Sequence, residues 1–261
     1  MSDQTASLEP VLAPAVQATA PIAVELARPG AWSATPRLAQ RIFVSIWRGQ
    51  PVEALRTTET SEPITGGAHR QWLAMLAAQS LLNGLLAVAI VARTMAGVRQ
   101  GIDSLLNAIP FMPSVSGALD IPAGTMFEIF LGIALIAFAA LVLRIVTMRW
   151  TFSSRGVSVP FIGAANILAT AHSVLFVPLA VALVCALIPG ALGALLLALV
   201  GLLGAVAAIT AEVVVYVGLN RTARFSKSAA IPHAAFTVVW FVLCGFVVLL
   251  AAALVIASKL S

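Results

Sequence analysis

Five long apolar segments dominate the chain, and each is long enough to cross a bilayer, for which a helix needs roughly 20 apolar residues. They cover about 73–93, 125–147, 161–187, 191–218 and 234–257. The third and fourth are separated only by Pro189-Gly190, a dipeptide typical of turns. None shows the short-period alternation of membrane-barrel strands. The pattern predicts an all-α, polytopic membrane bundle with five transmembrane helices, over residues 71–261.

Composition excludes a soluble domain, and the basic residues predict an orientation. Apolar residues make up 61% of the chain and charged residues 10%, whereas soluble domains carry about 25% charge. Twelve of the 15 Lys and Arg flank one side of the spans: Arg28, Arg37, Arg41, Arg48, Arg56, Arg70, Arg144, Arg149, Arg155, Arg221, Arg224 and Lys227. By the positive-inside rule, we expect a cytoplasmic N-terminus and an outward C-terminus. Topology thus accounts for the basic balance, and no nucleic-acid partner is expected.

The region before the first span divides into two parts. Residues 1–34 are rich in Ala and Pro, which predicts a disordered cytoplasmic tail. Residues 35–70 are predicted to hold an amphipathic helix, which starts at Thr35-Pro36, and then a polar linker over 50–68. Arg37, Arg41 and Arg48 share one helix face, opposite apolar residues. The helix either lies in the cytoplasmic interface with its arginines toward anionic lipid or packs on the ends of the bundle.

The loop over 94–124 is the longest between two spans. Val98, Ile102 and Leu105 recur in it at helical spacing, and Pro110 follows. This spacing predicts a short amphipathic helix on the outer surface, separate from the first span.

Charged residues inside the spans are few, and each costs about 2.5–3.5 kcal/mol on the insertion scale. Arg144 and Glu212 lie at similar depth near the inner ends of their helices, so they are expected to form an ion pair or to extend toward the interface. Glu128 lies one turn into the second span, within reach of outer water.

Neutral polar residues cluster in the first and third spans. They are Gln79, Asn83, Asn166, Thr170 and His172. Gln79 and Asn83 are four residues apart and are expected to share a face. One interpretation is interhelical hydrogen bonding. The other is a polar path or ligand pocket between the first and third helices, in which His172 exchanges protons.

Two features predict local helix geometry. Pro178 should kink the third helix or loosen one turn. The fourth helix carries small residues at fourfold spacing: Gly190, Ala194, Ala198, Gly201, Gly204, Ala205 and Ala208. Such spacing favours close packing with the third helix or with a second copy.

No catalytic or metal-binding motif is present in the sequence. The three histidines lack ligand spacing, and Cys185 and Cys244 lie at different depths. We therefore expect a protein that is not an enzyme and that needs no metal or other cofactor.

Two segments resemble the Yip1-like membrane proteins. They are RIFVSIWRGQP at 41–51 and VYVGLNRTARFSKSAAIPHAAFTVVW at 215–240. Together with the five-span layout, they are similar to bacterial members of that family. The resemblance implies an integral protein of the bacterial inner (cell) membrane, with no established chemistry. The Leu-Tyr/Trp-Gly-Pro-type signature of eukaryotic members is absent, so no small-GTPase partner is expected.

Two functions are compatible with this layout. The first is a non-enzymatic scaffold or assembly protein that contacts a membrane partner or a second copy of itself. Its lipid-headgroup contacts would come from Arg37, Arg41, Arg48, Arg221, Arg224 and Lys227. The alternative is a permease or transporter subunit with a polar path between the first and third helices.

Overall fold

The computed structural model describes residues 31–61, 71–106, 121–222 and 228–260. Its helices are α1 (Ala31–Trp47), α2 (Pro51–Ser61), α3 (Gln71–Leu106), α4 (Ala123–Ser153), α5 (Phe161–His172), the 3₁₀ turn η2 (Ser173–Leu175), α6 (Phe176–Leu187), α7 (Gly190–Thr222) and α8 (Ala230–Leu260). The tail predicted over 1–34 lies outside the described residues, except for its last four positions. There α1 has already begun.

The predicted class is confirmed, because five helical segments are long and apolar enough to cross a membrane. These segments are α3, α4, the α5–η2–α6 unit, α7 and α8. Most of them extend beyond the apolar segments read from the sequence, since polar residues that favour helix continue the same hydrogen-bond ladder at the ends. The chain is therefore a multi-pass membrane protein.

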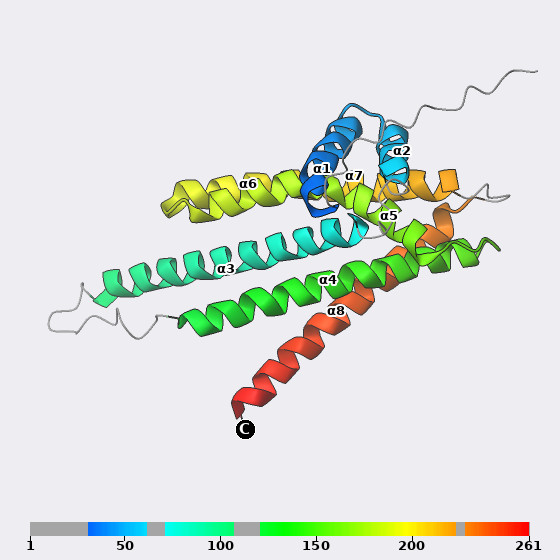
Figure 1. The fold of residues 1–261 in the computed structure, drawn as a ribbon. Helices are drawn as coiled ribbons and strands as arrows, with labels where there is room; N and C mark the ends of the chain where they lie inside the picture. Colours follow the sequence, from blue (N-terminus) through cyan, green and yellow to red (C-terminus); the bar gives the residue numbers. More distant parts are fainter. Residues whose placement is uncertain (1–30, 62–70, 107–120, 223–227, 261) are drawn as a thin grey trace, which may run out of the picture.

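The helices form a bundle with a cap at one end (Figure 1). Helix α3 packs along α4, and α6 packs along α7. Helices α1 and α2 lie across the end of the bundle where α3 begins, which we call the cap end; the other end is the far end. Helix α8 packs on α4 and diverges from it toward the C-terminus.

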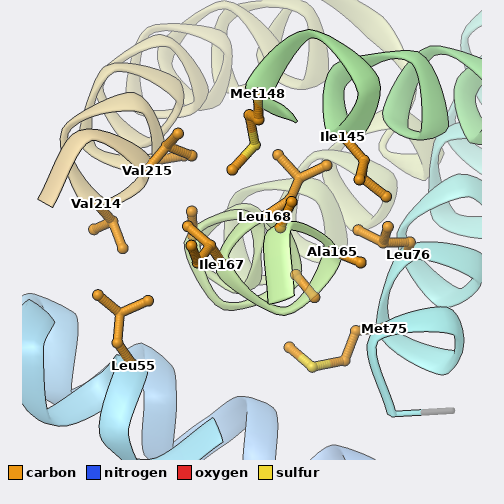
Figure 2. Close-up of a cluster of buried hydrophobic side chains, with 14 of the residues drawn as sticks. Leu55, Met75, Leu76, Ile145, Met148, Ala165, Ile167, Leu168, Val214 and Val215 are labelled. Carbon is orange, nitrogen blue, oxygen red and sulfur yellow. The ribbon is translucent and has the colours of Figure 1, made fainter. Parts of the chain in front are cut away.

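Helix α5 is the centre of the core. Figure 2 shows its residues Ala165, Ile167 and Leu168 surrounded by side chains of four other helices. The surrounding residues are Leu55 of α2, Met75 and Leu76 of α3, Ile145 and Met148 of α4, and Val214 and Val215 of α7. Water does not drive helices together inside a bilayer, so dense van der Waals packing at this point stabilises the association of the spans.

Helix α1 packs on the bundle. Ile42 and Ile46 are buried in the core, and α1 contacts α3 and η2. Arg37, Arg41 and Arg48 are exposed. Of the two interpretations of this helix, packing on the ends of the bundle is therefore the one that the structure supports.

The polar linker expected over 50–68 is wrong for its first part, which forms helix α2. Pro51 occupies the first helical position, where its missing N–H costs nothing. Ala54, Leu55 and Thr58 then fall on one face and are buried against α5 and α7. Three buried positions are a weak sequence pattern in a segment that is otherwise polar, and contacts with α5 and α7 stabilise the helix.

The helix expected within 94–124 is present as far as Leu106, but it is not separate from the first span. Helix α3 continues without a break to Leu106. No proline lies between 71 and 106, and the glycines at 97 and 101 each disfavour helix by only about 1 kcal/mol. The predicted stop at Pro110 lies outside the described residues.

The third span is broken, as Pro178 predicts. Proline has no N–H to offer the carbonyl of Val174, and the turn at that point tightens to the 3₁₀ segment η2 between α5 and α6. The next turn follows Ile188, where Gly190 adopts a φ of +71°, which favours glycine.

The small residues of α7 do not pack as expected. Ala194, Ala198, Gly201, Ala205 and Ala208 are exposed, and a Cβ on Gly201 or Gly204 would meet open space. The buried face of α7 carries Gly193, Ala207, Ala211 and Gly218 instead. Close packing of the fourfold pattern against the third helix is therefore wrong, because α7 turns a different face to α5 and α6. Contact with a second copy stays a prediction.

Candidate functional site

Two clusters of interacting polar side chains lie inside the described part of the bundle. The ionic cluster comprises Arg144, Glu212, His233, Thr237 and Trp240, from α4, α7 and α8. The neutral cluster comprises Thr58, Gln79, Thr170, His172 and Ser173, from α2, α3, α5 and η2.

Arg144 is the centre of the ionic cluster and is wholly buried. Its Nη2 donates to Glu212 Oε2 at 2.5 Å and to Thr237 Oγ1 at 2.8 Å. Its guanidinium carbon lies 5.3 Å from the centroid of the Trp240 ring, within the range of a cation–π contact. The ion pair expected from the similar depth of Arg144 and Glu212 is confirmed, and Arg144 points into the protein rather than toward the interface.

Helix α8 is attached to the bundle through this cluster. His233 Nε2 lies 3.4 Å from Glu212 Oε2, and Trp240 Nε1 donates to the Ala140 carbonyl of α4 at 2.7 Å. The sequence interpretation missed His233, Thr237 and Trp240. Their spacing of four and three residues places them on one face of a helix, and that pattern could have identified them.

The contacts of the ionic cluster join helices to one another. Arg144 and Glu212 neutralise each other, and the Glu212 side chain is 31% exposed. Arg144 Nε and His233 Nδ1 are buried without a hydrogen-bond partner among the described residues. Leaving one charge of such a pair alone in the interior is strongly unfavourable, so the pair fixes α4 against α7.

The neutral cluster links the cap to the third span. Gln79 Nε2 lies 3.2 Å from His172 Nδ1, and an amide nitrogen can only donate, so the ring nitrogen accepts. The hydroxyls of Thr58 and Thr170 lie 2.6 Å apart. Ser173 Oγ donates to the Thr170 carbonyl at 2.7 Å. The predicted pairing between the first and third spans is therefore confirmed for Gln79 and His172.

Asn83 does not join Gln79 in this contact. It lines a separate hollow with residues of α4 and α8. Four residues rotate a helix face by only about 40°, so Gln79 and Asn83 do share one broad face of α3. They meet different neighbours on it, because Gln79 contacts α5 and Asn83 faces α4 and α8.

A small polar hollow adjoins the neutral cluster on the α2 side. Its volume is about 90 Å³, and it is lined by Leu55, Thr58, Gly163, Asn166, Ile167, Thr170 and Thr222. At roughly 30 Å³ for each water molecule, it could hold about three waters. The structure thus brings Asn166 and Thr170 together, whereas Glu128 is exposed near the start of α4.

Arginines at the ends of the spans bind backbone carbonyls. At the cap end, Arg221 donates to the Val52 carbonyl at 2.7 Å, and Arg155 donates to the Ser228 carbonyl at 2.8 Å. At the far end, Arg93 donates to the carbonyls of Ile188 and Gly190 in the turn between α6 and α7. These residues brace the connections between helices. Arg224 and Lys227 lie outside the described residues.

The described residues contain no group of three or more His, Cys, Asp or Glu side chains that could hold a metal ion. Cys185 and Cys244 are both free. Comparison with protein-family models, with curated proteins and with solved structures found no match.

Proposed function

We propose that the chain is a non-enzymatic scaffold of the bacterial inner (cell) membrane, similar to Yip1-like proteins, which holds a second membrane protein against α8. The observation that carries this proposal is the uncovered state of α8. No residue in its most apolar stretch is buried, whereas 44% of the corresponding stretch of the third span is.

One face of α8 is suited to another helix. It carries Val238, Val242, Gly245, Phe246 and Leu249, all exposed, and we call it the bare face of α8. Val242 is 66% exposed and Phe246 is 63% exposed. A Cβ on Gly245 would meet open space, so a helix backbone can approach closely there. A partner helix would make closer van der Waals contacts with this face than lipid chains do.

The polar clusters support a scaffold because the contacts among their members join one helix to another. The Gln79–His172 and Thr58–Thr170 contacts join α3 to α5 and α2 to α5. Such interhelical hydrogen bonds contribute about 0.6–2 kcal/mol each inside a membrane. Their role in this proposal is to keep the bundle rigid behind the bare face of α8.

The orientation of the chain is part of the same proposal. With the cap end in the cytoplasm, the exposed Arg37 and Arg41 of α1, and Arg48 in the turn after it, would face anionic headgroups. Each such charge contributes about 1 kcal/mol near a charged membrane surface.

Site-specific photo-crosslinking in native membranes tests the scaffold. A photoreactive residue at Val242 or Phe246 should give a stoichiometric protein adduct, and differently tagged copies reveal whether the partner is a second copy. The control position is Leu199, which is exposed on α7. Adducts with lipid alone at all three positions would contradict the proposal.

A transporter subunit is the second candidate, and the break in the third span favours it. Discontinuous helices near the middle of the membrane surround the binding sites of many transporters. Here η2 follows His172 directly. The hollow of about 90 Å³ beside Thr170 would have to widen for a solute to pass. His172→Ala distinguishes the two candidates. Loss of a pH-dependent uptake with intact folded protein supports transport, whereas loss of bundle stability supports the scaffold.

A further inference from the structure

An apolar hollow of about 290 Å³ lies inside the membrane-spanning part, between α3, α4 and α8. The residues that matter for its chemistry are Asn83, Ala137, Ala140, Leu143, Cys244 and Val247. Asn83 lies 12 residues after the start of α3, about 18 Å along the helix axis at 1.5 Å a residue. The hydrocarbon core is about 30 Å thick, so the hollow is near its middle.

The hollow exists because α4 presents small side chains there and because α8 leaves α4. Ala137, Ala139 and Ala140 form one wall, and Cys244 and Val247 form the opposite wall. Figure 1 shows α8 diverging from α4 toward the C-terminus. Cys244 and Val247 lie on the opposite side of α8 from Val242 and Phe246, so this hollow is distinct from the bare face of α8.

Asn83 is the one lining residue with an amide, and none of the lining residues is charged. Its side chain makes no hydrogen bond with the described residues. The Asn83 side chain is half-buried, and an amide that is moved from water into an apolar medium without a partner loses stability. A molecule that accepts a hydrogen bond from the amide would therefore be held at this depth in preference to a plain hydrocarbon chain.

The volume limits the size of that molecule. At roughly 30 Å³ for each water-sized group, 290 Å³ holds about ten heavy atoms. A helix is about 10 Å across with its side chains and does not fit into this space. A small ring system or a short stretch of acyl chain does fit into the hollow.

We propose that this hollow binds a neutral, lipid-soluble carbonyl compound, whose oxygen accepts a hydrogen bond from the Asn83 amide and whose apolar body fills the space between α4 and α8. This is a ligand site in addition to the scaffold function. The absence of lining charge favours a neutral ligand over a fatty acid or another anion.

The two free cysteines provide a direct assay. In a Cys185→Ala variant, Cys244 is the remaining thiol, and its rate of alkylation by N-ethylmaleimide reports access to the hollow. The protein is reconstituted into phosphatidylcholine vesicles and treated with tetralone or with tetralin, which has the same ring frame without the carbonyl. Tetralone should slow alkylation several-fold at a concentration at which tetralin has no effect.

Two substitutions distinguish a hydrogen bond to the ligand carbonyl from simple filling of the hollow by an apolar molecule. Asn83→Leu keeps the volume of the side chain and should weaken tetralone protection about fivefold, the effect of one lost hydrogen bond. Ala140→Leu fills the hollow and should abolish protection. Ala198→Leu on the exposed face of α7 is the matched control and should retain it.

Binding is also measured without the thiol, because a ligand that binds the folded state raises the unfolding temperature. Tetralone should raise it for the unmodified chain and not for Asn83→Leu, provided that Asn83→Leu itself unfolds as cooperatively as the unmodified chain. Equal effects of tetralin and tetralone would show a plain acyl-chain groove, and no effect of either would show an empty crevice. Both results overturn the proposal.

Discussion

The guanidinium of Arg144, wholly buried on α4, donates a hydrogen bond of 2.5 Å to the Glu212 carboxylate on α7. The same Nη2 donates to Thr237 of α8, so one side chain holds three spans together. Because the pair is neutral as a unit, the membrane tolerates it, and either charge alone would be costly.

Replacing Glu212 alone should therefore destabilise the protein more than replacing Glu212 and Arg144 together. Glu212→Leu is expected to lower the free energy of unfolding by about 3–5 kcal/mol, because it leaves an unpaired guanidinium in the interior. Glu212→Leu combined with Arg144→Met should recover most of that loss. Unfolding of the detergent-solubilised protein measures both changes. The control is Glu128→Gln on the exposed start of α4, and additive effects of the two substitutions would contradict the coupling.

Arg93 should stabilise the turn between α6 and α7. Arg93→Gln removes a charged donor from the Ile188 and Gly190 carbonyls and should cost about 1.5–3 kcal/mol. Arg93→Lys should cost nearly as much, since one ammonium cannot reproduce the planar fork of the guanidinium. Arg48→Gln, in the exposed turn that follows α1, removes the same charge as a control. Equal stability of the Arg93 and Arg48 variants would refute this role.

Thr58 should hold α2 on the bundle. Thr58→Val keeps the shape of the side chain and removes its hydroxyl from Thr170, at an expected cost of about 1 kcal/mol. Hydrogen exchange of the α2 backbone is the sensitive measurement, because local opening of a short helix shows there before global unfolding does. The control is Thr94→Val on α3, whose hydroxyl donates to the Ile90 carbonyl of its own helix. Unchanged α2 exchange in Thr58→Val would contradict the prediction.

Gly84 should be required where α3 crosses α4. A Cβ at Gly84 would lie 2.7 Å from the Phe130 carbonyl oxygen, a backbone atom that cannot move aside cheaply. We expect Gly84→Ala to cost about 1–3 kcal/mol through overpacking. Gly132 on α4 has open space around its Cβ position, so Gly132→Ala should be neutral or stabilising by up to about 1 kcal/mol. A Gly84→Ala protein as stable as Gly132→Ala would show that the helices can separate freely.

The spans and the charged pair were predictable because their signals are local or strongly constrained. An apolar segment of 20 residues has one stable arrangement in a bilayer, and two opposite charges at equal depth have few other partners. Pro178 predicted the loosened turn, since its missing N–H acts on its own helix.

The contacts that the sequence did not reveal depend on which helix faces which. Gln79 and Asn83 are neighbours on one helix, yet α3 directs one toward His172 and the other toward Cys244. Nothing in the sequence around Arg93 indicates that it binds a turn 95 residues away. Helix α2 offers only a short buried face, and its stability comes from residues that follow far later in the chain.

The cap has a consequence for the order in which the protein is made. Helices α1 and α2 leave the ribosome before the spans, but Val52 is bound by Arg221 and Thr58 by Thr170. These contacts cannot form until the third and fourth spans have been synthesised and inserted. Helix α2 is therefore translated before the spans but docks fully only after α7 has inserted, and nascent chains that stop before α7 would display an incompletely docked α2 to chaperones and proteases.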